Sequence, residues 1–144
     1  MKNTNNVVLQ TVVKIMIPFI QVYGIFIIMN GHLSPGGGFA GGTILGSSLI
    51  LYSLAYGVKK GIERFPRNHA KVLESAGGIV FISIGLLTML RGGNFLSNNL
   101  FPGLGETGKL LSGGIIFPIT LAIGIKVAST IVTLFYHLLE EKKI

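Results

Sequence analysis

The sequence predicts an all-α integral membrane protein with four transmembrane helices and with both termini in the cytoplasm. Three observations support this fold class: the composition, four long apolar segments, and the distribution of basic residues. Of the 144 residues, 49% are hydrophobic and only 12% are charged, and the mean hydropathy is +0.68. Soluble globular domains carry about 25% charged residues. A soluble domain is therefore not expected.

Four segments are long enough to cross a hydrocarbon core of about 30 Å, which requires roughly 20 mostly apolar helical residues. The connecting segments are short and rich in Gly, Asn, Pro or charge, as is typical of turns. We therefore expect a single membrane domain over residues 1–144, with the first segment retained as a span rather than cleaved as a signal. The predicted spans are residues 7–29, 39–57, 72–90 and 112–139.

The orientation follows from the basic residues outside the spans, because cytoplasmic loops are enriched in Lys and Arg. On one side of the membrane, the predicted loops carry only Arg91 and Lys109. The other side carries the remaining basic residues outside the spans, and we expect it to be the cytoplasmic side of the cell (plasma) membrane. The net charge of +7 then reflects topology, and we expect no nucleic-acid partner. The basic second loop could also hold an anionic lipid. The cytoplasmic set is Lys2, Lys59, Lys60, Arg64, Arg67, Lys71, Lys142 and Lys143.

The residues that carry most enzyme and metal chemistry are sparse in this chain. It contains no Cys, so thiolate metal sites and disulfides are excluded. The histidines, His32, His69 and His137, have no metal-ligand spacing, and no nucleophile elbow or carboxylate cluster is present. We expect no metal, no cofactor and no covalent catalysis.

Two segments resemble phosphate-binding loops. Gly36, Gly38 and Gly41 match G-x-G-x-x-G, and residues 103–109 read GLGETGK, which approaches a P-loop. Both motifs require a preceding strand, and the P-loop also requires Ser or Thr where this chain has Leu110. Nucleotide binding is therefore not expected.

Glycines recur at helical spacing in the second span. Gly38, Gly42 and Gly46 form two successive small-xxx-small steps, which allow helix backbones to approach closely in lipid. We expect this stripe to be covered by another helix. The covering helix could belong to this chain or to another subunit.

The fourth span carries the clearest candidate for function, because Lys126 lies near its midpoint. A central Lys that faces lipid costs about 2.5–3.5 kcal/mol on translocon scales. Its face should therefore contact protein or water, either as a hydrated ion or proton path or as an amine paired with a carboxylate of another helix. The residues predicted to share this face are Ser129, Thr130, Thr133 and His137.

Two further ionisable residues lie within predicted spans. Lys14 lies about 10 Å from the start of the first span, so its side chain could extend to the cytoplasmic surface or line an ion path. Glu74 is the only acidic residue of the third span. It could pair with Lys71 at i+3, the interpretation we favour, or hold a proton at the mouth of a path.

The first loop and the start of the second span read NGHLSPGGGFAGG, from Asn30 to Gly42. Pro and Gly in this order favour a tight turn. The segment resembles the B subunit of multisubunit Mrp-type (Mnh-type) sodium/proton antiporters, whose members carry GH-x-x-PGGGF, and the resemblance extends over nearly the whole chain. The matching residues are Gly31, His32, Pro35, Gly36, Gly37, Gly38 and Phe39.

The resemblance implies an accessory subunit that lies beside other membrane subunits of an antiporter module handling sodium ions and protons. Similar B subunits occur in archaeal membrane-bound hydrogenase and sulfur-reducing complexes. The resemblance implies a structural or path-lining role for the loop residues. This chain departs from the family pattern in the segment from Ile123 to Val127, where other members carry Asp. A purely structural scaffold and a self-sufficient carrier or channel are the alternatives.

Overall fold

The computed structural model describes residues 2–33, 36–98 and 113–141, which form helices joined by turns and contain no strand. Four of the helices are long and apolar enough to cross a membrane: Val7–Met29, Gly37–Tyr56, Arg67–Leu90 and Ile116–Leu139. The predicted fold class, a multi-pass membrane protein with four spans, is therefore confirmed. The complete helices are α1 (Lys2–Met29), α2 (Gly37–Tyr56), α3 (Val58–Arg64), α4 (Arg67–Leu90) and α5 (Ile116–Glu141).

The second connection differs from the prediction, which treated residues 58–71 as a loop. It contains the short helix α3, and α4 already begins at Arg67. Gly57, with φ of 96°, separates α2 from α3, and the extended Pro66 separates α3 from α4. Helical structure is therefore interrupted at these two positions, and the basic residues between them are good helix formers.

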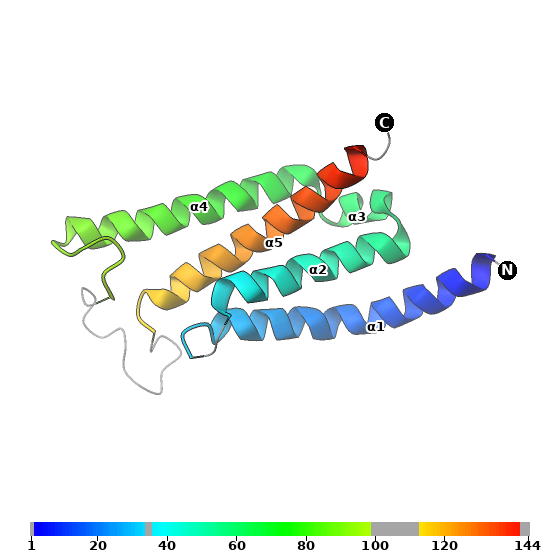
Figure 1. The fold of residues 1–144 in the computed structure, drawn as a ribbon, viewed down its shortest axis with the longest axis horizontal. Coiled ribbons are helices and arrows are strands. Elements are labelled where there is room, and N and C mark those ends of the chain that lie inside the picture. Colours follow the sequence, from blue (N-terminus) through cyan, green and yellow to red (C-terminus); the bar gives the residue numbers. More distant parts are fainter. Residues whose placement is uncertain (1, 34–35, 99–112, 142–144) are drawn as a thin grey trace.

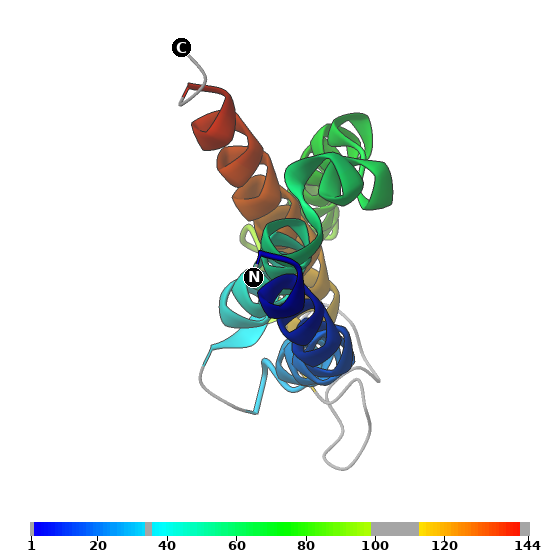
Figure 2. The same ribbon diagram turned by 90° about the vertical axis from the view of Figure 1, so that its right-hand side faces the viewer.

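The long helices form an open row in the order α1, α2, α5, α4 (Figure 1). The end view also places α1 and α4 at different edges (Figure 2). Each edge helix consequently has an uncovered apolar surface: Phe19 on α1 is 72% exposed and Ile79 on α4 is 65% exposed. Such surfaces suit contact with lipid or with other membrane chains.

The glycine stripe of α2 faces α5 of the same chain. A Cβ atom at Gly42 would lie 2.5 Å from the carbonyl oxygen of Gly124, and one at Gly46 would lie 3.1 Å from that of Ala128. A Cβ at Gly38 would collide with the Thr120 carbonyl. The two backbones are therefore in direct contact along about two turns of helix.

The outer helix pairs also meet at glycines. On the α1 side, a Cβ atom at Gly41 would lie 2.7 Å from the carbonyl oxygen of Gly24. On the α4 side, a Cβ atom at Gly77 would lie 2.8 Å from that of Ala122. Close backbone contact thus joins all neighbouring helices of the row.

One end of the row is basic. Helix α1 begins, α5 ends and α3 lies at this end (Figure 1), and Lys59, Lys60 and Arg64 of α3 are exposed there. This arrangement matches the predicted separation of basic residues. That this end faces the cytoplasm stays a prediction.

We predict that a single Cys at Lys60 reacts with thiol reagents from the cytoplasmic side, because basic loops remain inside. A single Cys at Asn94, at the other end of α4, should react from the external side. Labelling of intact cells and of inverted vesicles with an impermeant maleimide measures both. The reverse pattern would contradict the orientation.

We predict that Gly42→Ala lowers the thermal stability of the purified protein by about 1–3 kcal/mol, because the added methyl group must push α2 away from α5. Gly78→Ala is the matched control, since its Cβ would meet only the Lys126 Nζ, at 3.8 Å. Thermal unfolding of both variants in the same detergent gives the comparison. Equal melting temperatures for the two variants would show that the α2–α5 contact is not tight.

Candidate functional site

Lys126 lies in a pocket between α4 and α5, ten residues after Ile116 and thirteen before Leu139, the two ends of its span. The pocket has a volume of about 410 Å³ and is lined by Gly77, Gly78, Phe81, Ile82, Ile123 and Lys126. The two glycines have no side chains, which leaves room for the aliphatic part of the Lys126 side chain. A Cβ atom added at Gly77 would lie only 2.9 Å from the Lys126 Cβ. Among the described residues that line the pocket, Lys126 carries the only charged group and the others are apolar.

The Lys126 side chain is exposed at the surface of this chain. Within the described residues, its amine has no hydrogen-bond or ion-pair partner. That the face of Lys126 contacts protein or water stays a prediction. An amine at this depth in a membrane requires a polar or charged group beside it, which the described residues do not provide.

The hydroxyl groups near Lys126 are bonded to their own helix. Ser129 Oγ donates to the carbonyls of Ile125 and Lys126, both at 2.9 Å, and Thr130 Oγ1 donates to that of Lys126 at 2.9 Å. Thr133 Oγ1 donates to the Ser129 carbonyl at 2.9 Å. Their protons are engaged, but their oxygens can still accept a hydrogen bond or contact a cation.

The predicted polar face of α5 is divided between different environments. Ser129 is buried at 1% exposure, whereas Lys126 and His137 are exposed. Thr133 and His137 line a separate small pocket with Arg67, Lys71 and Tyr136. The structure therefore does not join the five predicted residues into one continuous pocket.

Glu74 is half-buried on α4. It lies one helical turn from Gly77 and so on the side of α4 that approaches Lys126. The favoured ion pair with Lys71 is not formed, because neither of these two described side chains has an ionic partner. At i+3 both side chains can also extend separately toward the membrane surface, which removes the need to pair.

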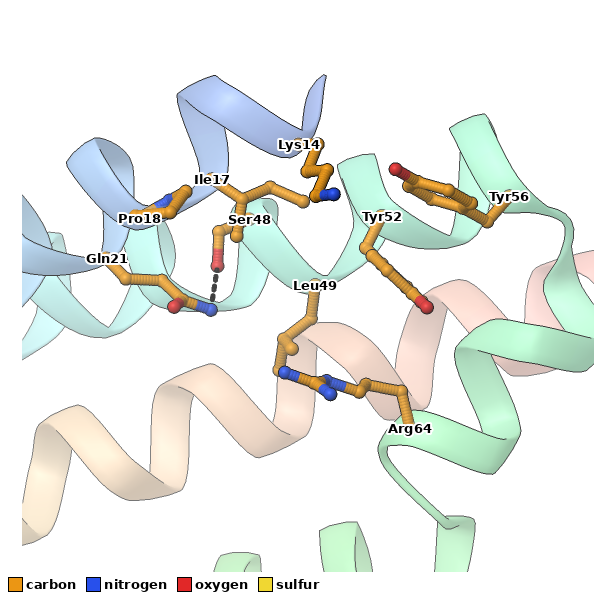
Figure 3. A pocket seen from close by; sticks show the side chains of 9 residues that line it. All are labelled: Lys14, Ile17, Pro18, Gln21, Ser48, Leu49, Tyr52, Tyr56 and Arg64. Carbon is orange, nitrogen blue, oxygen red and sulfur yellow. Dashed lines mark hydrogen bonds between the residues drawn. The ribbon is translucent and has the colours of Figure 1, made fainter. Parts of the chain in front are cut away.

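Lys14 lines a second pocket of about 200 Å³, between α1 and α2 (Figure 3). Arg64 reaches it from α3. The walls combine further polar groups with apolar side chains: Ile17, Pro18, Gln21, Ser48, Leu49, Tyr52 and Tyr56. Lys14 and Lys126 therefore belong to different pockets, which lie on different helix pairs of the row.

Hydrogen bonds join α1 to α2 around this second pocket. Tyr56 Oη donates to the Gln10 carbonyl at 3.0 Å, and Gln10 Nε2 donates to the Ala55 carbonyl at 3.2 Å. Deeper in the span, Gln21 Nε2 donates to Ser48 Oγ at 3.4 Å. These contacts account for Gln10 and Gln21 of α1, and an ion-path role for Lys14 stays a prediction.

The glycine-rich first loop packs against the start of α5. Gly36 and Gly37 have φ of 121° and 52°, a conformation that favours glycine. A Cβ atom at Gly31 would lie 2.7 Å from the Gly37 Cα, and one at Gly113 would lie 2.8 Å from His32. The described part of the loop is therefore closely packed, and whether it is structural or lines a path stays open. Phe39 is 68% exposed, and Pro35 lies outside the described residues.

The sequence model of the family described as "Domain related to MnhB subunit of Na+/H+ antiporter" matches residues 8–133. The chain belongs to this family. A Staphylococcus aureus (strain Newman) protein that carries the name antiporter subunit mnhB2 is 34% identical over 123 residues, which cover 80% of this chain and 86% of the relative. The corresponding proteins of strains JH1 and COL match to the same extent.

A solved structure also matches this MnhB-family chain. It is a chain of the membrane-bound sulfane sulfur reductase, an archaeal respiratory membrane complex, with a TM-score of 0.75 and 33% identity. The match covers 92% of the present chain and 57% of the longer one. Together, the family and this match support a subunit of a multisubunit antiporter-type module.

Sequence reasoning missed most of the α1–α2 pocket. The signal was present, because Ser48, Tyr52 and Tyr56 recur every four residues on α2 and form a polar stripe like that of α1. The two phosphate-loop matches gain no support: the described residues between α1 and Gly36 form a turn rather than a strand. Residues 103–109 lie outside the described part of this MnhB-family chain.

Proposed function

We propose that this chain is an accessory membrane subunit of a multisubunit cation/proton antiporter module, and that it contributes both to assembly and to an ion path. The observation that carries the proposal is Lys126, a mid-membrane amine that is exposed and without a partner among the described residues. The family, the relatives named as antiporter subunits and the respiratory membrane complex support the same class of protein.

The free-energy cost of exposing Lys126 to hydrocarbon favours a neighbouring membrane chain at this surface. Exposure of a central Lys to hydrocarbon costs about 2.5–3.5 kcal/mol. A neighbouring membrane chain that covers the Lys126 pocket removes this cost if it brings a carboxylate, a polar group or water. Lys126 is exposed at this pocket of α4 and α5, so such a neighbour can reach it.

The same pocket has the components of a proton-exchanging site. A lysine amine can take part in proton transfer, whereas an arginine guanidinium keeps its proton. Glu74 lies about one turn closer to the basic end of α4 and can pass protons between the pocket and that membrane surface. In this proposal sodium ions and protons move along the covered α4–α5 surface, and the host module supplies the remaining path.

The scaffold alternative rests on the same lysine. There, Lys126 pairs permanently with a carboxylate of the neighbouring chain and transfers no proton. A self-sufficient carrier has less support, because the Lys14 and Lys126 pockets are separated by the packed α2–α5 pair. The Lys126 variants below distinguish path from scaffold.

We predict that Lys126→Met and Lys126→Arg both assemble with the partner subunits but lose sodium-driven pH change in proteoliposomes. Met keeps the length without the charge, and Arg keeps a charge that does not give up its proton. The measurement is the rate of internal pH change after a sodium pulse, with assembly checked by co-purification. We expect at least about a tenfold loss of rate, equivalent to 1.4 kcal/mol in the barrier.

Lys59→Met, on exposed α3, is the matched control and should transport normally. If Lys126→Arg transports normally while Lys126→Met fails to assemble, Lys126 is a structural charge and the scaffold reading is correct. Normal transport by Lys126→Met would refute both roles.

A further inference from the structure

We propose that the pocket between α1 and α2 binds a phosphate group, presented by the headgroup of an anionic phospholipid at the basic end of the protein. The pocket contains Lys14, Tyr52 and Arg64 (Figure 3). This site is independent of Lys126 and of the proposed ion path.

The pocket has an excess of hydrogen-bond donors. Within the described residues, the Lys14 amine, the Arg64 guanidinium and the Tyr52 hydroxyl have no hydrogen-bond partner. The other polar groups are already engaged, since Tyr56 bonds to Gln10 and Gln21 bonds to Ser48. None of the described residues that line the pocket has a carboxylate. Two cations and a free hydroxyl around one cavity call for an anion with several acceptor oxygens, as a phosphate has.

The two cations approach the pocket from different depths. Lys14 comes from the spanning helix α1, about 10 Å inward from Val7. Arg64 comes from α3 at the basic end and extends toward Leu49 (Figure 3). A group held between them lies near the boundary between hydrocarbon and headgroups, where lipid phosphates are found and where long basic side chains extend.

The apolar wall of the pocket favours a lipid over free phosphate. Ile17, Pro18 and Leu49 line it beside the polar groups. Further along the same side of α1, Val22 is 67% exposed and Ile25 is 49% exposed. An acyl chain attached to a phosphate in the pocket can run along this surface toward the middle of the bilayer, which an inorganic ion cannot use.

The test compares ligands on the purified assembled complex by native mass spectrometry. Dihexanoyl phosphatidylglycerol should bind, whereas dihexanoylglycerol, which lacks the phosphate, should not. Lys14→Met and Arg64→Gln should each weaken binding about tenfold, because each removes one charge-assisted hydrogen bond. Tyr52→Phe should weaken it by about threefold. Lys60→Gln, an exposed α3 residue that does not line the pocket, should leave the affinity unchanged.

Lys14→Arg preserves the charge and should restore binding, which separates loss of the site from loss of folding. Unchanged phosphatidylglycerol affinity in the Lys14→Met, Arg64→Gln double variant would overturn the proposal. Equal affinity for inorganic phosphate would overturn the lipid as its source. If the complex binds no phosphatidylglycerol and Lys14→Met releases a neighbouring subunit, a protein carboxylate occupies the pocket and the proposal is wrong.

Discussion

The arrangement of this chain depends on direct backbone contact between α5 and its two neighbours. Gly42 and Gly124 allow α2 and α5 to touch, and Gly77 brings α4 against Ala122. In lipid, where the hydrophobic effect does not drive helices together, such contacts supply the packing energy through dispersion. They also set the position of Lys126, because the side chain passes over the surface that Gly77 and Gly78 leave open.

A row rather than a closed bundle has a consequence for function. Among the described helices, α2 and α5 have neighbours on both sides, and the two outer pairs hold the Lys14 pocket and the Lys126 pocket. The α4–α5 pocket holds an amine at membrane depth and calls for a polar neighbour. The α1–α2 pocket holds its cations near the basic end, where a headgroup can satisfy them. In the two proposals, the α4–α5 surface contacts another protein chain and the α1–α2 surface contacts lipid.

Much of this fold could be predicted from the sequence, because span length, apolar content and basic-residue bias are local properties. Helix α3 was missed because its charged residues resemble those of a loop. The partner of the Gly38 stripe could not be predicted, because small-residue spacing is the same whether the covering helix is internal or foreign. Periodicity placed Lys126, Thr133 and His137 on one face, but which of them share a pocket depends on how α4 crosses α5.

The central claim is that Lys126 is compensated by a group from outside this chain. A density map of the assembled complex in lipid nanodiscs, at a resolution that shows side chains, tests it most directly. The account predicts a neighbouring chain over Gly77, Gly78 and Lys126, with a carboxylate, a polar group or ordered water within hydrogen-bond distance of the amine. Acyl chains packed around Lys126, with no polar atom near its Nζ, would contradict it.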